Sequence, residues 1–316
     1  MLYQQESEFG GMEFHINRLT EELRKMGHEV DVVKKGKFGV TLFPVFKKDF
    51  LKKYDVVHLH GSHAGFLLKD NILTVHTVIK KFLEIEPNNL LYRLGELTEG
   101  RTIKNAKKII SVSDVVRDDI KRFYGRDSIV IENAIDVPDK FFGFNLKANK
   151  VVCVGRIKKI KNFEFVLRVA KELPEITFLI CGDHNKSYIS KLMKIAPENV
   201  NFLGFVNRNH LFTLYKRALF SFFASKYEAS PFSILESMAY GCPVVAPSLE
   251  YTKPYKDKED VVLYKFNDIE DAVEKIKLLL RDSLLRVRIA LNAYSRVKKY
   301  TWEDVAKKVV EVYENG

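Results

Sequence analysis

Apolar residues recur along this chain in two patterns, short continuous runs typical of buried strands and a 3.6-residue period typical of amphipathic helices. In the first part of the chain, helices are predicted at residues 12–26, 87–106 and 114–123. Strands are predicted between them at residues 29–33, 55–59, 72–75, 108–112 and 128–131. Short apolar strands that alternate with helices indicate a parallel sheet covered on both faces, as in a doubly wound domain.

This rhythm stops at residues 137–150, which are predicted to form a linker, and then begins again. Further strands are predicted at residues 151–154, 177–181, 200–203, 219–223 and 244–246. Further helices are predicted at residues 162–173, 187–195, 209–217, 269–280 and 283–300. The predicted fold class is therefore α/β, with two doubly wound, Rossmann-like domains that face one another across a cleft. Ligands of such sheets bind at the carboxyl ends of the strands.

Residues 226–246 are the most informative segment, because they place two carboxylates around a predicted helix start. Ser230 is predicted as the N-cap, with Pro231 in the first turn. Glu228 then precedes the helix, and Glu236 lies about two turns into it. Unpaired N–H groups at a helix start can hold an anion. The segment therefore suits a ligand with phosphates at one end and hydroxyls at the other, such as a nucleotide sugar.

This segment resembles the Glu-x7-Glu signature of retaining glycosyltransferases of the family 4 type, and three other elements resemble that family in the same order. Gly10-Gly11-Met12-Glu13 is similar to its N-terminal glycine loop. Gly155-Arg156 followed by Lys161 is similar to its Gly-Arg-x4-Lys element, and Asn133-Ala-Ile-Asp136 to its Asn-Gly-x-Asp turn. The family usually has a full first strand before the glycine loop, and here about nine residues are present in its place.

The resemblance implies the GT-B architecture. Residues 1–140 would form the acceptor-side domain, and residues of about 302–316 would pack back onto it as a C-terminal helix. Residues 141–301 would bind the nucleotide sugar. The implied reaction moves a sugar from a UDP-, GDP- or ADP-sugar to a hydroxyl acceptor, which could be a glycan, a lipid-linked molecule or a small molecule. No cofactor is expected.

Arg156 and Lys161 directly follow a predicted strand, where two fixed cations would stabilise the charge that a departing diphosphate gathers. The resemblance implies that Glu228 lies near the donor sugar and that His76, at a strand end, faces the reacting centre. His76, Arg156, Lys161 and Glu228 are thus the expected catalytic residues. The residues expected to bind the donor are Gly10, Gly11, Gly155, Gly182, Asp183, Val206, Ser230, Pro231, Phe232, Ser233 and Glu236, the last of these at the ribose hydroxyls.

Three histidines in the segment His58-Leu-His60-Gly-Ser-His63 raise the alternative of a metal site. Alternation along a strand places His58 and His60 on the same face. No carboxylate or cysteine in the neighbouring sequence completes a ligand set, so no metal is expected there. The sequence also lacks a metal-binding Asp-x-Asp element, which fits a metal-independent transferase.

The formal net charge is +11, with a pI of about 9.3, and basic residues form local runs. Solvated surface is the favoured interpretation of these runs, and attraction to an anionic membrane or an acidic acceptor is the alternative. No nucleic-acid motif is present, so no nucleic-acid partner is expected. The runs are Lys34-Lys35-Gly36-Lys37, Lys47-Lys48, Lys52-Lys53, Lys80-Lys81 and Lys107-Lys108.

The three cysteines, Cys153, Cys181 and Cys242, are unclustered and are predicted to be buried free thiols. Together with the absence of a signal-peptide pattern, they favour a cytoplasmic enzyme, with peripheral attachment to the inner membrane face as an open extension. Two alternatives to a glycosyltransferase remain open from the sequence. One is a nucleotide-sugar epimerase of the same architecture, and the other is a non-catalytic basic module that docks on membranes or polymers. The oligomeric state is left open.

Overall fold

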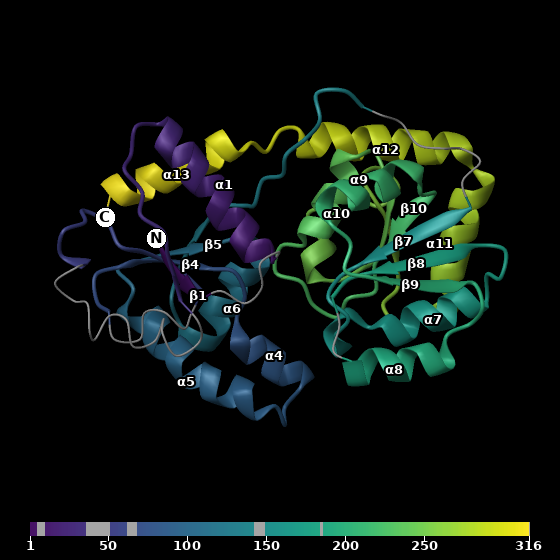
Figure 1. Cartoon of the computed structure of the whole chain (residues 1–316), viewed down its shortest axis with the longest axis horizontal. Helices are drawn as coiled ribbons and strands as arrows, with labels where there is room; N and C mark the ends of the chain where they lie inside the picture. Colours follow the sequence, from purple (N-terminus) through teal and green to yellow (C-terminus); the bar gives the residue numbers. More distant parts are fainter. Residues whose placement is uncertain (5–9, 36–50, 62–67, 142–148, 184–185, 316) are drawn as a thin grey trace. The chain divides into compact units, whose positions relative to one another are not determined.

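The computed structural model describes residues 1–4, 10–35, 51–61, 68–141, 149–183 and 186–315. The chain divides into two compact units, the first made of Met1–Ala134 and Thr301–Gly316 and the second of Ile135–Tyr300 (Figure 1). Within the described residues, each unit contains one six-stranded parallel sheet with helices packed against it. The predicted α/β class with two Rossmann-like halves is confirmed.

The sheet of the first unit has the strand order β2-β1-β3-β4-β5-β6, and all its neighbouring strands are parallel. The short segment before the glycine loop does form a strand, which pairs on both sides. The strands are β1 (Leu2–Gln4), β2 (Val33–Lys35), β3 (His58–His60), β4 (Ile72–Val75), β5 (Lys108–Ser111) and β6 (Ile129–Val130).

The strand predicted at residues 29–33 is wrong in position, because β2 begins only at Val33. Leu2, the first residue of β1, is in register with Val33, so the neighbouring strand sets where pairing starts. The residues before β2 make other hydrogen bonds. The backbone carbonyl of Val30 accepts one from the Arg24 side chain at 2.6 Å. Backbone pairing has overridden the apolar pattern at this edge of the sheet.

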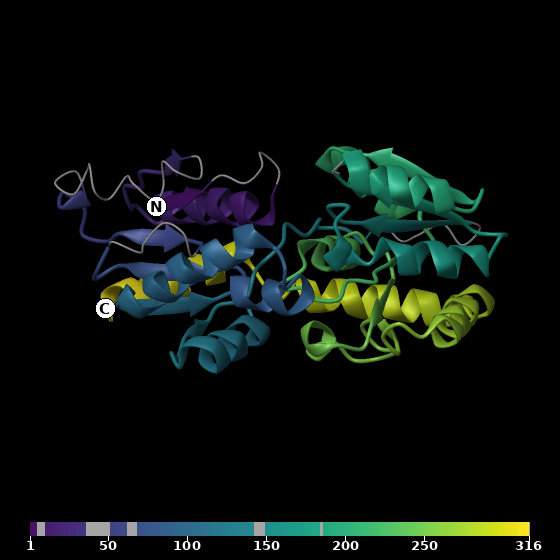
Figure 2. The same ribbon diagram turned by 90° about the horizontal axis from the view of Figure 1, so that it is seen from below.

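The helices of the first unit include the last one of the chain, α13, which lies against α1 (Figures 1 and 2, where α13 is yellow). The ring of Phe14 on α1 meets Trp302 edge-on, with centroids 5.7 Å apart. A stripe at Ile16, Leu19 and Leu23 on α1 is fully buried, as its period predicts. The helices are α1 (Gly11–Lys25), α4 (Ile79–Ile85), α5 (Leu90–Asn105), α6 (Asp114–Tyr124) and α13 (Trp302–Glu314); α4 was not predicted.

The sheet of the second unit has the order β12-β11-β10-β7-β8-β9, again with parallel neighbours. Its strands are β7 (Lys150–Val154), β8 (Thr177–Cys181), β9 (Val200–Gly204), β10 (Phe220–Phe222), β11 (Val244–Pro247) and β12 (Val262–Tyr264). The edge strand β12 was not predicted, because it is short and charged residues precede it.

Strand alternation builds a core on each face of this second sheet. On β7, Val151 and Cys153 belong to one apolar cluster, whereas Val152 belongs to another. On β8, Phe178 shares the first cluster and Leu179 the second. Because successive side chains of a strand point to opposite faces, the two clusters lie on opposite sides of the sheet. This arrangement explains why these strands are almost continuously apolar.

The helices of the second unit cover both faces of its sheet. They are α7 (Phe163–Lys171), α8 (Lys186–Ile195), α9 (Arg208–Arg217), α10 (Phe232–Ala239), α11 (Ile269–Arg281) and α12 (Ser283–Val297), with 3-10 turns at Lys159–Lys161 and Glu250–Thr252. The predicted start of α10 needs one correction, since Pro231 rather than Ser230 is the N-cap. Pro231 has ψ near 100°, which is extended, so the helix begins one residue later than predicted.

Three glycines close the carboxyl ends of β7, β8 and β9 and extend the sheet by one more row of hydrogen bonds. The Gly155 N–H donates to the Cys181 carbonyl at 3.0 Å, and the Gly182 N–H donates to the Gly204 carbonyl at 2.8 Å. A Cβ at position 182 would overlap the carbonyl oxygen of Gly155 and lie 2.7 Å from its carbonyl carbon. Only glycine allows the two backbones to approach this closely.

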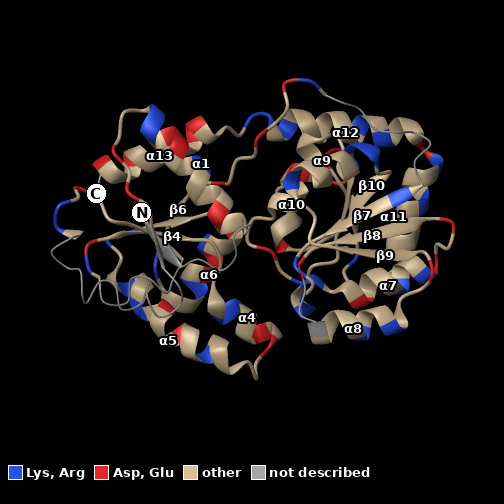
Figure 3. Ribbon diagram, in the orientation of Figure 1, with Lys and Arg blue, Asp and Glu red and all other residues tan. Residues whose placement is uncertain are grey.

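Basic and acidic residues are interspersed along the helices of both units (Figure 3). Among the predicted basic runs, Lys80 pairs with Glu96 at 3.1 Å and Lys81 with Glu84 at 2.7 Å. These pairs support solvated surface as the interpretation of that run. Residues 36–50 and the side chains of Lys34 and Lys35 lie outside the described part of the chain. No helix among the described residues is both long and apolar enough to span a bilayer.

Replacement of Gly182 by Ala should lower the free energy of unfolding by about 3 kcal/mol, because the new methyl group overlaps the backbone of Gly155. The matched control is Gly204→Ala in the same row. Gly204 has a φ of +66°, but a Cβ there would meet no atom within 4 Å, so its substitution should cost only about 1 kcal/mol. Urea unfolding followed by circular dichroism measures both. Equal losses in the two variants would contradict the proposed overlap.

Candidate active site

At the carboxyl edge of the second sheet, Lys161 and Glu228 form an ion pair, although they are far apart in the sequence. The aliphatic part of Lys161 lies over Gly155, at 3.3 Å from the position that a Cβ would take there. Both charged side chains are largely covered, with exposed fractions of 20% and 14%. The structure thus brings together two residues that were predicted separately, one for the diphosphate and one for the sugar.

A backbone hydrogen bond explains why these two loops meet. The Lys226 N–H, after β10, donates to the Ile160 carbonyl at 2.8 Å, in the turn after β7. The strands β7 and β10 are parallel neighbours, so both loops leave the same edge of the sheet. Asn162 follows the turn with a φ of +57° and starts α7. The left-handed residue lets the chain reverse directly after Lys161.

Glu236 lies on α10 with only 6% of its surface exposed, and Arg208 at the start of α9 pairs with it. Arg208 donates from Nε to Glu236 Oε1 at 3.1 Å and from Nη2 to the same oxygen. Burial raises the pKa of Glu236, and the nearby guanidinium opposes that rise. Sequence reasoning missed Arg208. A cation just after a strand was the signal, as it was for Arg156.

The start of α10 carries four of the predicted donor-binding residues. Pro231 is buried, whereas Ser230, Phe232 and Ser233 are partly exposed. The N-cap residue, Pro231, makes no side-chain capping hydrogen bond. The Ser233 carbonyl accepts a hydrogen bond from the buried Tyr215 hydroxyl at 3.2 Å, which fixes α10 against α9. The first N–H groups of a helix have no acceptor within the helix, so this start is a candidate anion site.

The remaining predicted residues of the second unit also lie at this edge. Arg156 and Asp183 are exposed and follow β7 and β8. Their loops are joined, because the Ile157 N–H donates to the Asp183 carbonyl at 2.8 Å. Val206, between β9 and α9, packs against the apolar cluster around Tyr215. The edge thus presents cations, carboxylates and closely packed glycines on neighbouring loops.

In the first unit, Gly10 is the N-cap of α1 and Gly11 is its first residue, so both lie at a helix start as predicted. His76 directly follows β4, at the carboxyl end of that strand. The structure places Gly10, Gly11 and His76 in a different unit from the other predicted site residues. The expectation that the two units face one another across a cleft stays a prediction.

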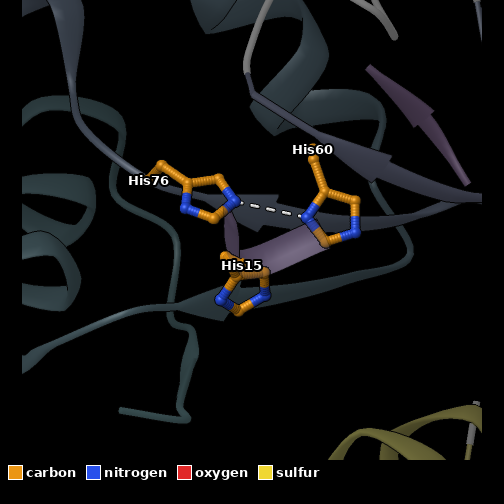
Figure 4. Close-up of side chains that lie close together, drawn as sticks. All are labelled: His15, His60 and His76. Atoms are coloured by element: carbon orange, nitrogen blue, oxygen red, sulfur yellow. Dashed lines mark hydrogen bonds between the residues drawn. The ribbon is translucent and has the colours of Figure 1, made fainter. Parts of the chain in front are cut away.

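His76 lies in a cluster of histidines that the sequence did not reveal as a whole (Figure 4). His60 Nδ1 is 3.2 Å from His76 Nε2, and the ring of His15 from α1 lies 4.8 Å from that of His76. Asn133, which was predicted only to shape a turn, holds His15 through a 2.8 Å hydrogen bond between Asn133 Oδ1 and His15 Nδ1. His58 shares the β3 face with His60, as predicted, with ring centroids 4.2 Å apart. His63 lies outside the described residues.

Cys153, Cys181 and Cys242 are free and buried, which confirms the prediction made from their sequence positions. Burial raises the pKa of Cys181 and of Cys242 to about 12. Thiols of this kind are protonated at neutral pH and are poor nucleophiles. All three lie in the second unit and contribute apolar packing to its core clusters.

The whole chain resembles solved glycosyltransferase structures. A sucrose-phosphate synthase from Thermosynechococcus elongatus matches with a TM-score of 0.85 and 17% identity, covering 99% of this chain and 98% of the other. Anabaena HepE, solved in complex with UDP and glucose, matches with a TM-score of 0.80 and 15% identity, covering 100% and 99%. The fold is therefore that of the GT-B glycosyltransferases.

Sequence comparison reaches the same class. The family described as Glycosyl transferases group 1 matches residues 136–296, and Glycosyltransferase Family 4 matches residues 34–138. An uncharacterized glycosyltransferase of Methanocaldococcus jannaschii is 25% identical, covering 96% of this chain and 94% of its own length. A phosphatidyl-myo-inositol mannosyltransferase of Mycolicibacterium smegmatis is 24% identical, covering 96% and 90%.

The chain belongs to the group 1 glycosyl transferases, with a first part of the family 4 type. It is a glycosyltransferase, and this membership decides against the non-catalytic docking module considered from the sequence. Membership also favours group transfer over the epimerase alternative.

The histidine cluster should make the first unit unstable in mild acid. Burial lowers the pKa of His15 to about 4 and holds the pKa values of His58, His60 and His76 well below 6.5. Below pH 6.5 the unfolded chain binds protons that the folded chain does not, so stability falls with pH. His15 alone should contribute a loss of about 3 kcal/mol between pH 6.5 and pH 4.

Urea unfolding at a series of pH values, followed through the fluorescence of Trp302, measures this loss in the unit concerned. Trp302 is the single tryptophan of the chain, and its ring lies 5.5 Å from that of His15. The steep part should begin near pH 6.5, above the range in which most carboxylates titrate. His15→Gln should flatten the slope, whereas His28→Gln at an exposed position should not. A flat profile between pH 6.5 and pH 5 would contradict the explanation.

Proposed function

We propose that this glycosyltransferase is a retaining, metal-independent enzyme that moves a sugar from a nucleoside diphosphate sugar to a hydroxyl acceptor. The observation that supports it best is the edge of the second sheet, where two cation–carboxylate pairs lie beside the closely packed Gly155 and Gly182. A diphosphate needs cations and N–H groups, whereas a ribose and a sugar need carboxylates that accept from hydroxyls. This edge offers both.

The Lys161–Glu228 pair holds the two side chains in place for a donor. An arriving diphosphate would take over the ammonium group of Lys161, since it carries more negative charge than one carboxylate. Glu228 would then be free to accept hydrogen bonds from the hydroxyls of the donor sugar. The exchange replaces one charged partner with another, so Lys161 is never left buried without a counter-charge.

The hydrogen bonds of Glu236 support a role as a ribose ligand. Both hydrogen bonds from Arg208 end on Oε1, which leaves Oε2 directed away from that pairing. A carboxylate only accepts hydrogen bonds, so Glu236 would match the two donating hydroxyls of a ribose. The carboxylate would repel phosphate, so the diphosphate belongs at Arg156 and Lys161 instead.

In the proposed reaction, the bond between the sugar C1 atom and the diphosphate oxygen breaks, and the electron pair leaves with the diphosphate. Arg156 and Lys161 stabilise this growing charge more in the transition state than in the ground state. The acceptor oxygen forms its bond to C1 from the same face. Its proton passes to the departing phosphate oxygen, so the configuration at C1 is retained without a covalent enzyme intermediate.

The comparisons support the substrate classes. HepE was solved with UDP-glucose, which favours a nucleotide-sugar donor. Several relatives are named phosphatidyl-myo-inositol mannosyltransferases, which favours a lipid-linked hydroxyl among the acceptors. The first unit would supply the acceptor side, with His76 near the reacting centre. Such an enzyme would act in the cytoplasm, at the inner membrane face when its acceptor is a lipid.

A thermal-shift series with UDP-, GDP- and ADP-sugars tests the donor class. The matching sugar at about 100 times its Kd should stabilise the native state by about 2.7 kcal/mol and raise Tm by about 5 °C. Glu236→Gln should lose most of this rise, whereas Glu198→Gln, at an exposed position of the same unit, should keep it. If none of the three shifts Tm at millimolar concentration, the donor assignment is wrong.

Replacement of Arg156 by Ala should lower kcat/KM about 100- to 1,000-fold, because one cation that stabilises the leaving group is removed. The side chain is exposed, so the circular dichroism spectrum and Tm should hardly change. The control is Arg217→Ala, which removes an exposed arginine at the end of α9. Activity is measured as release of the nucleoside diphosphate. Full turnover in a folded Arg156→Ala variant would refute the role.

A further inference from the structure

Three buried or partly buried histidines of the first unit converge from three different elements. His15 comes from α1, His60 from β3 and His76 from the residue after β4 (Figure 4). One ring nitrogen from each lies within 4.8 Å of the others. Neutral imidazole nitrogens are the commonest protein ligands of transition metals, and three of them form the usual minimum set for Zn²⁺.

The hydrogen bond of His15 to Asn133 leaves its other ring nitrogen, Nε2, with a free lone pair. Asn133 Oδ1 can only accept, so His15 Nδ1 carries the hydrogen of their 2.8 Å bond. His15 Nε2 is then unprotonated, and in the described part of the chain it is buried without a hydrogen-bond partner. A histidine whose second nitrogen donates to a fixed oxygen is the arrangement that orients metal ligands.

The spacing of the other two histidines fits a shared cation. His60 Nδ1 and His76 Nε2 are 3.2 Å apart. Two nitrogens bound tetrahedrally to zinc at about 2.0–2.1 Å would be separated by about 3.3 Å. A metal ion could therefore replace the shared hydrogen between these nitrogens with little movement. The three ligand nitrogens lie within 4.8 Å of one another, so the ring of His15 would have to move toward the other two.

The fourth histidine of the cluster is already committed elsewhere. His58 Nδ1 bonds to the Tyr313 hydroxyl and His58 Nε2 to Thr74 Oγ1, both at 2.7 Å. It is therefore a structural neighbour and not a ligand.

We propose that His15, His60 and His76 form a site for a divalent transition metal such as Zn²⁺, with a water molecule as the fourth ligand. The sequence motif indicated the opposite, because it includes only His58, His60 and His63. Two of the proposed ligands lie elsewhere in the chain, and they join the third only through the fold. Metal bound here would also hold His76 and should inhibit transfer; that consequence alone depends on the proposed function.

Cobalt(II) added to chelator-treated protein at pH 7.5 tests the site, because tetrahedral Co²⁺ absorbs strongly in the visible range. One equivalent should bind and give that absorption, and one equivalent of Zn²⁺ should displace it. Mass spectrometry of the metal content after dialysis against Zn²⁺ should give one ion per chain. His15→Gln and His60→Gln should each weaken binding at least 100-fold, whereas His28→Gln, an exposed histidine of the same unit, should bind as the wild type does.

Wild-type protein that binds neither ion saturably at micromolar concentration would overturn the site, whether or not the variants fold. Binding that survives in a folded His15→Gln/His60→Gln double variant would also overturn it, because the ion would then lie elsewhere. A rise in Tm of the wild type with Zn²⁺ that is absent in His60→Gln would support it. These outcomes do not involve activity, so they stay separate from the donor thermal-shift result.

Discussion

The backbone contact between Gly155 and Gly182 is the constraint on which the site of the second unit depends. It lets the ends of β7 and β8 approach without side chains between them, and the pairing continues to Gly204 at the end of β9. The loops that leave these strands therefore begin beside one another, at closely paired glycines. Lys161 can then lie directly over glycine backbone, where any larger residue at position 155 would displace it.

Charge pairing is the second requirement, because this edge holds carboxylates that are largely withdrawn from water. Glu236 is almost fully buried and would be costly as an isolated anion. Arg208 compensates for it, and Lys161 does the same for Glu228. Lys161 lies in the turn after β7 and pairs with Glu228 in the loop before α10, whereas Arg208 begins α9 and pairs with Glu236 on α10. The site is thus organised before any ligand is present, which lowers the entropy cost of binding.

The fold could be predicted well where strands are buried on both faces. Residues 72–75 and 177–181 were placed to the residue, because a central parallel strand must be apolar throughout. Edge strands were predicted poorly. The position of β2 follows its pairing with β1, and β12 is too short for its pattern to stand out. At such positions backbone pairing outweighs side-chain pattern.

The candidate site residues also divide into those that could be predicted from the sequence and those that could not. Glu228 and Glu236 could be found from a local motif. Arg208 follows a strand, but its role depends on a partner 28 positions away. His15 offered no local signal, because its partner lies 118 positions away.

The histidines of the first unit show what such distant contacts can produce. Each is ordinary in its own element: one on the buried face of α1, two on alternate positions of β3, and one at the end of β4. Their convergence keeps His15 Nε2 buried and without a partner among the described residues. An unpaired buried polar atom costs about 1–3 kcal/mol. A cation can accept that lone pair and those of His60 and His76 at the same time, whereas a hydrogen-bond donor such as water would satisfy them only one by one. The fold therefore gains most from a ligand that is positively charged.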